Sequence, residues 1–349
     1  MSRHSENATL RSPDCCMGPE FMKESPLRKA PRLAVLLSTA FLAPPMVFAQ
    51  TFPAKPIRVV TQYVAGSSGD NSLRFVAPFM SASMGQPVVI ENRPGAGGVL
   101  AAEQVMRAAP DGYSILASNS ATHVIRQFLV KNMSFDPAKD FTPITQLTEG
   151  TGAIVVSPSF PAANVREMLD YARTNPGKVA FGTSGIGSEH HLTAENLMQL
   201  SGVKLLHVPY KAGAQAMLDV SAGQLPMAVG VLGGAQPLVA SGKLKLLGVV
   251  SARRHAQFPQ VATVGEAVPG FVAPSSWTGI FGPAGLPAPL ARRISGEFSK
   301  AVNDPETREK LLNAGNDPVA STPEQFAESM AKEIALVRRI VQAAGIKPE

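Results

Sequence analysis

Residues 181–202, FGTSGIGSEHHLTAENLMQLSG, combine glycines, small hydroxyl side chains and two adjacent histidines between a short apolar run and an amphipathic helical pattern. Such a combination could form a phosphate-binding loop, a metal site, a nucleophile turn or a pocket for another anion. The spacing within the stretch, together with the rest of the sequence, decides among these four kinds of site.

Two of these kinds of site need spacings that the stretch lacks. A phosphate-binding loop ends in Gly-Lys-Ser/Thr and a dinucleotide fingerprint reads G-x-G-x-x-G, whereas this loop reads G-x-x-G-x-G with no lysine after it. A nucleophile elbow reads G-x-S-x-G, but Ser184 is followed directly by Gly185. Because the sequence proposes no base for Ser184, a serine hydrolase is not expected.

The histidines do not have the spacing of metal ligands. His190 and His191 are adjacent, so on a helix they point about 100° apart and cannot share one ion. His123, His207 and His255 lie in unrelated segments. We interpret His190 and His191 as solvent-facing or capping residues, and we expect neither a metal nor a cofactor.

A second loop, VAGSSGDNSL (residues 64–73), has the same design as the first. Both loops join the end of a strand to the start of a helix, where unpaired backbone N–H groups and the helix dipole favour an anion. Two such loops facing each other would clamp an anion. Asp70 in the second loop is either a ligand contact or a first-turn acid that stabilises its helix.

The first 49 residues are typical of an export signal rather than of a folded domain. A basic segment (23–32) precedes an apolar one (33–42), and Val-Phe-Ala at 47–49 forms a small-x-small cleavage site. The apolar segment is shorter than the ~20 residues that a membrane-spanning helix needs. We therefore predict a periplasmic protein cleaved after Ala49, which starts at either Met1 or Met22, and both cysteines lie in the segment removed.

The charge of the remaining 300 residues is mildly positive. Six of the 32 Lys and Arg residues and four of the 26 Asp and Glu residues precede Gln50, which leaves 26 basic against 22 acidic residues and a net charge of +4. The basic residues are scattered and form no stripe interleaved with aromatics, so nucleic acid is not expected as a partner. A mild positive charge suits a small anionic ligand equally well.

Short β-branched runs alternate with helical patterns along this part of the chain, as in parallel α/β layers. Strands are predicted at 57–64, 87–92, 113–119, 153–157, 179–184, 204–208, 225–231 and 244–250, and helices at 70–84 and 98–108. Asn164 with Glu167 predicts one further helix start, and Thr322 with Pro323 and Gln325 predicts another.

The ordered segments AGSSGDN, GQPVVIENRPGAGG, AAPDGYSIL, NPGKVAFGTSGIGSEHHL, HVPYKAGAQAMLD and WTGIFGPAGLP resemble the substrate-binding proteins of tripartite tricarboxylate transporters, the Bug (Bordetella uptake gene) family. The resemblance covers residues 50–349. It implies a two-domain α/β periplasmic binding protein fold, type II-like, with a ligand cleft between the domains. Domain 1 would comprise residues 50–151 and 271–349, and domain 2 residues 152–270, joined by crossover strands.

The same resemblance implies a binding protein, not an enzyme, that captures a small carboxylate as a monomer. The less favoured alternative is an enzyme on the same fold, for which the sequence supplies no nucleophile or base oriented by a partner. The partners of the binding protein would be membrane transporter subunits or a sensor kinase, which the sequence does not separate. Carried over by position, the ligand contacts would come from both domains: Tyr63, Gly66, Ser67, Ser68, Asp70, Ser118, Asn119, Ser120, Thr183, Ser184, Gly185, Ser188 and Tyr210. Tyr210 could equally be a core aromatic whose hydroxyl finds a backbone partner.

Several residues depart from the pattern of the family. Ser67-Ser68 and Tyr63 replace glycines and a phenylalanine, which predicts a more polar pocket. Arg126 could reach a second carboxylate or lie on a helix surface. Gly230 stands where the family has a carboxylate that could meet an ammonium group, which disfavours an α-amino acid as ligand.

Overall fold

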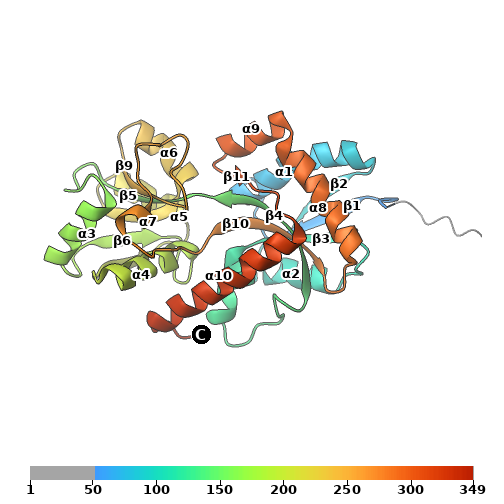
Figure 1. Ribbon diagram of the computed structural model, residues 1–349, viewed down its shortest axis with the longest axis horizontal. Helices are drawn as coiled ribbons and strands as arrows, with labels where there is room; N and C mark the ends of the chain where they lie inside the picture. Colours follow the sequence, from blue (N-terminus) through green and yellow to red (C-terminus); the bar gives the residue numbers. More distant parts are fainter. Residues whose placement is uncertain (1–51, 349) are drawn as a thin grey trace, which may run out of the picture. The chain divides into compact units, whose positions relative to one another are not determined.

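The computed structural model describes residues 52–348, which belong to one compact unit spanning Gln50–Glu349. The predicted export signal and its cleavage site after Ala49 lie outside the described residues. Two β-sheets, each covered by helices on both faces, give the α/β class expected from the sequence (Figure 1). Among the described residues, no helix is both long and apolar enough to cross a membrane.

The first sheet has six strands in the order β11-β4-β10-β3-β1-β2. Its strands are β1 (Ile57–Thr61), β2 (Val88–Asn92), β3 (Ser114–Asn119), β4 (Phe141–Gly150), β10 (Ser276–Pro283) and β11 (Asp317–Pro318). The helices around it are α1 (Ser68–Met84), α2 (Val99–Met106), α8 (Ala288–Asn303), α9 (Pro305–Asn313) and α10 (Pro323–Ala343), with short turns η1 (Ala96–Gly98), η2 (Ala121–Ile125) and η3 (Arg126–Phe128). We call this part, residues 52–150 and 276–348, the first lobe.

The second sheet has five strands in the order β7-β6-β8-β5-β9. Its strands are β5 (Gly152–Val156), β6 (Ala180–Thr183), β7 (Leu206–Pro209), β8 (Met227–Val231) and β9 (Lys245–Val250). Its helices are α3 (Val165–Thr174), α4 (Glu189–Ser201), α5 (Gly213–Ser221), α6 (Leu232–Ala240) and α7 (Val264–Ala267). We call this part, residues 152–271, the second lobe (Figure 1).

Helices cover both faces of each sheet (Figure 1). Because successive strand residues point to opposite sides, both sets of side chains in a strand are buried. In β5, Ile154 and Val156 join the core on one face, while Ala153 and Val155 join the core on the other. This double burial explains why the strands read as continuous apolar runs in the sequence.

The predicted helix starts are confirmed at residue level. The side chain of Asn164 accepts a hydrogen bond from Glu167 N–H at the start of α3. Thr322 and Gln325 form a full capping box at the start of α10, with Pro323 in its first turn. Both devices satisfy N–H groups that the helix itself leaves without acceptors.

Both sheets are mixed, whereas the alternation of strands and helices by itself indicated parallel layers. Strand β10 runs antiparallel to β3 and β4, and β5 runs antiparallel to β8 and β9. The chain passes from β4 through Thr151 into β5, and it returns through residues 251–275 into β10. Each crossing therefore adds a strand that runs antiparallel to its neighbours, β5 in the second sheet and β10 in the first. The strand pattern missed β4, whose Thr145, Gln146 and Thr148 are polar and buried.

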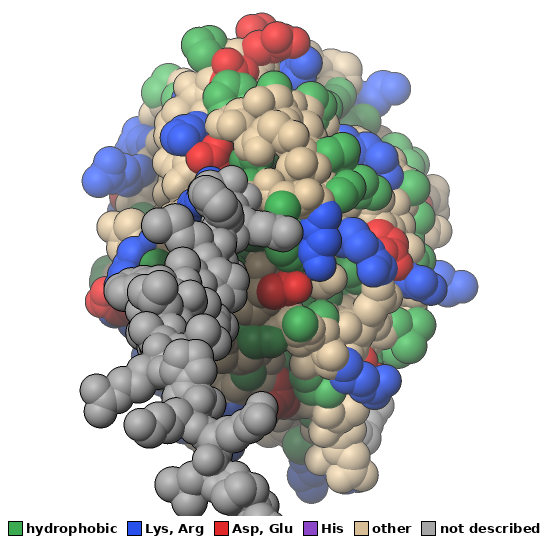
Figure 2. Space-filling model, turned by 90° about the vertical axis from the view of Figure 1, so that its right-hand side faces the viewer, with side chains coloured by type: hydrophobic (Ala, Val, Ile, Leu, Met, Phe, Trp, Pro, Cys, Tyr) green, Lys and Arg blue, Asp and Glu red, His purple; other side chains and the backbone are tan. Residues whose placement is uncertain are grey.

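The surface charge agrees with the scattered pattern of the sequence. On the face of the first lobe shown in Figure 2, Lys and Arg side chains lie in separate groups interspersed with Asp and Glu. Where the described residues form this face, their basic side chains make no continuous stripe.

Candidate functional site

A cavity of about 510 Å³ lies between the two lobes. Such a volume suits a small organic ligand. The first lobe lines it with Tyr63, Ser68, Gly69, Asn119, Thr148, Gly150, Ser276, Trp277, Thr278, Ala314 and Asn316. The second lobe lines it with Ser184, Glu189, His190, Gly213, Ala214, Met217, Val231, Gly233 and Gly234.

Helices α1, α4, α5 and α6 all begin at this cavity. The first-turn N–H groups of a helix have no acceptor inside it, and they form the positive end of its dipole. The starts of α1, α5 and α6 carry no side-chain cap. Among the residues that the structure describes, no Lys or Arg lines the cavity. An anion there would be held by backbone dipoles and hydroxyls.

The four helix starts are not equally available. Ser188 caps α4 by accepting a bond from His191 N–H, and the first N–H of α6, at Leu232, donates to the Thr151 carbonyl at 2.8 Å. The two starts best placed for an anion are therefore α1 from the first lobe and α5 from the second. Sequence reasoning placed the second-lobe clamp at α4 and missed α5.

Ser68, at the start of α1, is held by a partner that sequence reasoning also missed. Asn316, after α9, donates from Nδ2 to Ser68 Oγ at 2.9 Å and accepts within 3.1 Å through Oδ1. Both residues line the cavity. A remote asparagine that fixes a loop hydroxyl leaves no signal in local sequence spacing.

Tyr63 forms the floor under the start of α1. A Cβ on Gly69 would lie within 2.4–2.6 Å of the Tyr63 ring, so only glycine allows the helix backbone to rest on the ring. The Tyr63 hydroxyl contacts Thr278 Oγ1 at 2.9 Å and donates to the Ser118 carbonyl at 3.4 Å. Burial raises the pKa of Tyr63, so the hydroxyl stays protonated and can donate.

Asp70 supports the first loop and does not line the cavity. Its buried carboxylate accepts from Gly66 N–H (2.8 Å), Arg74 Nε (2.7 Å) and Asn92 Nδ2 (2.7 Å). Burial opposes its charged form, but these bonds together hold the pKa of Asp70 below its ordinary value. These bonds favour the stabilising interpretation of Asp70, whose side chain does not line the cavity.

Four of the predicted contacts, Tyr63, Ser68, Asn119 and Ser184, come together in the cavity. The others lie behind its wall: Gly66, Ser67, Asp70, Ser118, Ser120, Thr183, Gly185, Ser188 and Tyr210. Most of their polar side chains bond within the protein, whereas Ser67 Oγ is buried without a partner among the described residues. Ser120 donates to the Ser275 carbonyl at 2.6 Å, and Tyr210 donates to Asp219 at 2.7 Å. These residues shape the loops and do not reach the cavity surface.

The adjacent histidines do not face solvent, which corrects the first half of their interpretation. Both are 6% exposed. His191 does cap the loop, because its Nδ1 accepts from Gly187 N–H at 3.0 Å, and its ring stacks on His207 at 4.0 Å between centroids. His190 lines the cavity, where its Nδ1 lies 3.0 Å from Ser184 Oγ.

This serine and histidine do not form a hydrolytic triad. In such a triad the carboxylate contacts the imidazole nitrogen opposite the serine and orients the ring. Here Glu189 Oε1 lies 3.9 Å from the same Nδ1 that faces Ser184, and the described residues give Nε2 no partner. Within residues 52–348, no group of His, Cys, Asp and Glu is arranged to hold a metal ion.

The structure shows the surroundings of two residues that depart from the pattern of the family, Arg126 and Gly230. Arg126 packs against Gly97, where a Cβ would lie 2.3 Å from its Nη1, and it does not line the cavity. A Cβ on Gly230 would lie 2.4 Å from Cε of Met217, a cavity residue. An acid at position 230 would therefore collide with the wall formed by Met217.

The sequence profile of a protein family described as the tripartite tricarboxylate transporter family receptor (TctC) matches residues 73–346. The chain belongs to this family. A UPF0065 protein of Bordetella bronchiseptica is 33% identical over 320 residues, which cover 90% of this chain and 95% of the relative. Protein BugT of Bordetella pertussis is 29% identical over 317 residues, covering 90% and 97%.

Solved structures show the same architecture. A periplasmic transporter protein is 31% identical with a TM-score of 0.72, covering 85% of this TctC-family chain and 99% of its own. An R. palustris protein solved with adipate is 28% identical with a TM-score of 0.74, covering 85% and 100%. MatC of Rhodopseudomonas palustris, with bound malate, is 30% identical with a TM-score of 0.69, covering 83% and 100%. This TctC-family chain is thus a periplasmic solute-binding protein with a two-domain α/β fold, as its motifs implied.

Proposed function

We propose that this TctC-family protein captures a small organic carboxylate in the periplasm and delivers it to the membrane subunits of a tripartite tricarboxylate-type transporter. The observation that carries the proposal is the meeting of uncapped helix starts at a cavity lined by no Lys or Arg among the described residues. Such starts bind carboxylates through backbone N–H groups.

In this proposal, the carboxylate lies between the starts of α1 and α5. Its oxygens accept from the first-turn N–H groups at Ser68 and Gly69 and at Gly213 and Ala214. Ser184 adds a hydroxyl from the second lobe, because its Cβ lies 3.8 Å from the position of a Cβ on Gly213. Charge-assisted bonds of this kind are roughly twice as strong as neutral ones.

The proposal agrees with the ligands named for two relatives. The R. palustris relative holds adipate and MatC holds malate, and both ligands are small carboxylates. We infer the same ligand class here, with an export signal over residues 1–49 that delivers the chain to the periplasm.

Capture would couple to movement of two domains, residues 50–151 with 271–349 against residues 152–270. The links between them, at Thr151 and before β10, are short. A ligand that bonds to α1 and α5 together stabilises the arrangement in which both reach it, and it does so by its differential affinity for that arrangement. The membrane partner would then recognise the liganded arrangement.

Calorimetry of the purified mature chain tests the capture of carboxylates. A panel of small mono- and dicarboxylic acids is compared with the methyl esters and amides of the same acids. We expect the acids to bind and the neutral derivatives to bind at least tenfold more weakly, since the loss of charge removes at least one charge-assisted bond. Equal binding of acids and esters would show that the helix starts do not recognise charge.

A further inference from the structure

Glu189 occupies an unusual place for an acid in a carboxylate-binding protein. It is the first residue of α4, and among the described residues it is the only Asp, Glu, Lys or Arg that lines the cavity of about 510 Å³ between the lobes. Its side chain is 18% exposed. Ser276, from β10 of the first lobe, donates to its Oε1 at 3.3 Å. The acid is therefore fixed at the junction of the two lobes.

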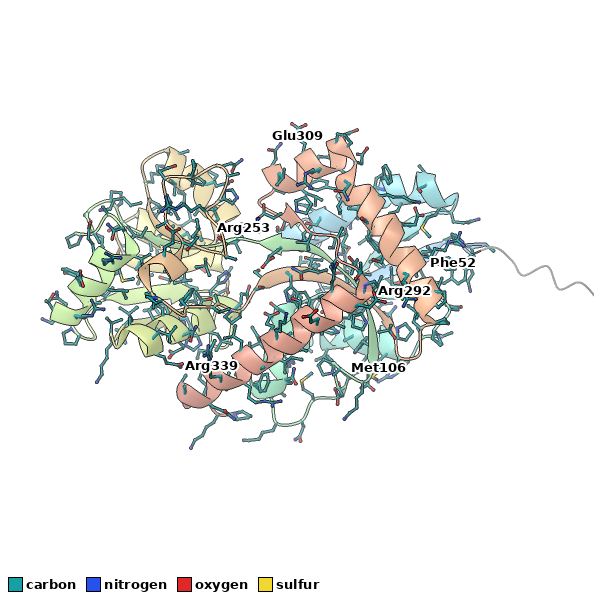
Figure 3. The ribbon with its side chains drawn as sticks, in the orientation of Figure 1. Phe52, Met106, Arg253, Arg292, Glu309 and Arg339 are labelled. Carbon is teal, nitrogen blue, oxygen red and sulfur yellow. The ribbon has the colours of Figure 1, made fainter. Side chains whose placement is uncertain are left out.

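A second cavity, of about 220 Å³, adjoins the first at Glu189. The two cavities share Gly150, Glu189, His190 and Ser276. Glu149 also lines the second cavity, and no Lys or Arg does so within the described residues. Arg253, at the edge of the second lobe that faces the first (Figure 3), lines a third cavity and neither of these two.

His190, beside Glu189, has a polar atom that nothing in the described chain satisfies. The residue is 6% exposed, and its Nδ1 is occupied by Ser184 at 3.0 Å. Its Nε2 is buried and has no hydrogen-bond partner among the described residues. Because buried polar atoms are nearly always hydrogen-bonded, this nitrogen would take a water or a polar ligand atom as its partner.

The groups that line the two adjoining cavities favour opposite charges. The uncapped starts of α1 and α5 in the first cavity favour an anion, whereas Glu189, which lines both cavities, and Glu149, which lines the second, disfavour one. A partly buried carboxylate is costly unless a cationic group pairs with it. Glu149 lines the third cavity together with Arg253, whereas the nitrogen beside Glu189 is His190 Nδ1, at 3.9 Å, which already faces Ser184. A diacid spanning the cavity would place its second carboxylate against Glu189.

We propose that Glu189 is the specificity-determining residue of the site, and that it selects a carboxylate whose far end carries a protonated nitrogen over a diacid of the same length. The inference rests on the proposed capture of carboxylates. The ligand carboxylate lies at α1 and α5, and its nitrogen donates to Glu189. The sequence disfavoured an α-amino acid because Gly230 lacks a carboxylate that could meet its ammonium group, whereas Glu189 of α4 would meet an ammonium group at another place in the cavity.

The test uses probes of equal length that differ only at one end: hexanoate, adipate and 6-aminohexanoate, and the shorter set butanoate, succinate and 4-aminobutanoate. Affinities are measured by calorimetry for the wild-type chain and for Glu189→Gln, which keeps the acceptor for Ser276 and removes the charge. Asp170→Asn, an exposed acid on α3 of the same lobe, is the matched control for net charge. Thermal unfolding without ligand verifies that all three proteins are folded.

In the wild type, we expect the amino acid of one set to bind about tenfold or more tightly than the diacid of that set, the size of one charge-assisted bond. Glu189→Gln should weaken that amino acid by about tenfold to hundredfold and strengthen the diacid, whereas Asp170→Asn should change neither ratio. Tighter binding of the diacid by the wild type, or equal losses for both probes in Glu189→Gln, would overturn the inference while leaving carboxylate capture intact. If no acid of either set binds, and if the acids of the larger panel bind no better than their esters, both proposals are overturned.

Discussion

Gly233 and Gly315 bring the two lobes into backbone contact beside the cavity. A Cβ on Gly233, in α6 of the second lobe, would lie 2.9 Å from Cα of Gly315, which follows α9 in the first lobe. A Cβ on Gly315 would lie 2.6 Å from Cα of Gly233. No side chain fits between them, so this contact requires glycine on both sides.

The contact predicts that Gly233→Ala weakens binding without harming the fold. Alanine is favoured over glycine in a helix by roughly 0.5–1 kcal/mol, so α6 itself should be at least as stable. The added methyl group should hold the lobes apart on this side and reduce ligand affinity about tenfold or more. Solution X-ray scattering at saturation should then give a larger radius of gyration than for the liganded wild type.

The neighbouring glycine supplies the control for this variant. A Cβ on Gly234 has as its nearest neighbour Met217 Sδ at 3.8 Å, an ordinary contact, so Gly234→Ala should leave the liganded radius of gyration at its wild-type value. Wild-type affinity and scattering for Gly233→Ala would show that the two glycines need not meet when the ligand is bound.

Ser184→Ala and Gly185→Val should differ sharply in their effect on binding. The alanine removes one hydroxyl bond of roughly 0.5–1.5 kcal/mol, which is a few-fold to about tenfold in affinity. Valine at position 185 meets a φ of +116° and the Tyr210 carbonyl 3.3 Å from its Cβ, so it should distort the loop. Calorimetry and thermal unfolding distinguish a lost site from a lost fold.

The same contrast applies in the first lobe to Ser68→Ala and Gly66→Val. Gly66 has a φ of +81°, which a β-branched residue adopts only under strain. Complete loss of binding in both alanine variants, with binding retained by the folded valine variants, would show that side chains and not backbone N–H groups hold the ligand.

Asp70→Asn should reduce stability more than it changes ligand specificity. The carboxylate accepts three bonds that hold Gly66, Arg74 and Asn92 together, and bonds to charged groups contribute roughly 1.5–3 kcal/mol each. Because its folded pKa is lowered, this stabilisation is present above the ordinary pKa and is lost as the pH falls through the folded value. Denaturant unfolding at neutral and acidic pH measures both effects, and wild-type stability in the variant would refute the structural role.

Glu333 should make the protein less stable as the pH rises toward neutrality. Burial raises the pKa of Glu333 from 4.5 to about 7, against the opposing bonds from Trp277 Nε1 (2.7 Å) and Ser275 N–H (3.0 Å). Between these two pKa values the folded protein binds a proton that the unfolded chain has released, so the free energy of unfolding falls with pH. The fall should total on the order of 3 kcal/mol and level off above about pH 7.

Glu333→Gln should remove this part of the pH dependence, because its amide does not titrate. Glu328→Gln, an exposed position on the same helix, should keep it. Denaturant unfolding across the range from about pH 5 to about pH 8 is the measurement. Parallel pH profiles for the wild type and Glu333→Gln would contradict the raised pKa.

Sequence patterns predicted the local parts of the structure and missed those that depend on long-range contacts. Apolar runs and caps such as Asn164 and Thr322 act within a few residues, and the structure confirms them. Strand β4 was missed because its buried Thr145, Gln146 and Thr148 are polar where the chain passes between sheets. Local spacing cannot show that Asn316 reaches Ser68, since 248 residues separate them.

In the candidate site too, local features were predicted from the sequence and long-range contacts were not. The two glycine-serine loops were found because the start of a helix is a local feature. The start of α5, which faces the cavity without a side-chain cap, was not found, because the sequence drew attention to the start of α4, which Ser188 caps. His190 was interpreted as solvent-facing or capping because a single sequence does not show that its ring lines a cavity between the lobes.

The measurement that tests the central claim most directly is a crystal structure with the tightest acid of the calorimetric panel. We predict that the carboxylate lies in the cavity between the lobes, with its oxygens about 2.7–3.2 Å from first-turn N–H groups of both α1 and α5. A carboxylate held instead by Lys or Arg side chains, or bound outside the cavity between the lobes, would contradict the proposed mode of capture.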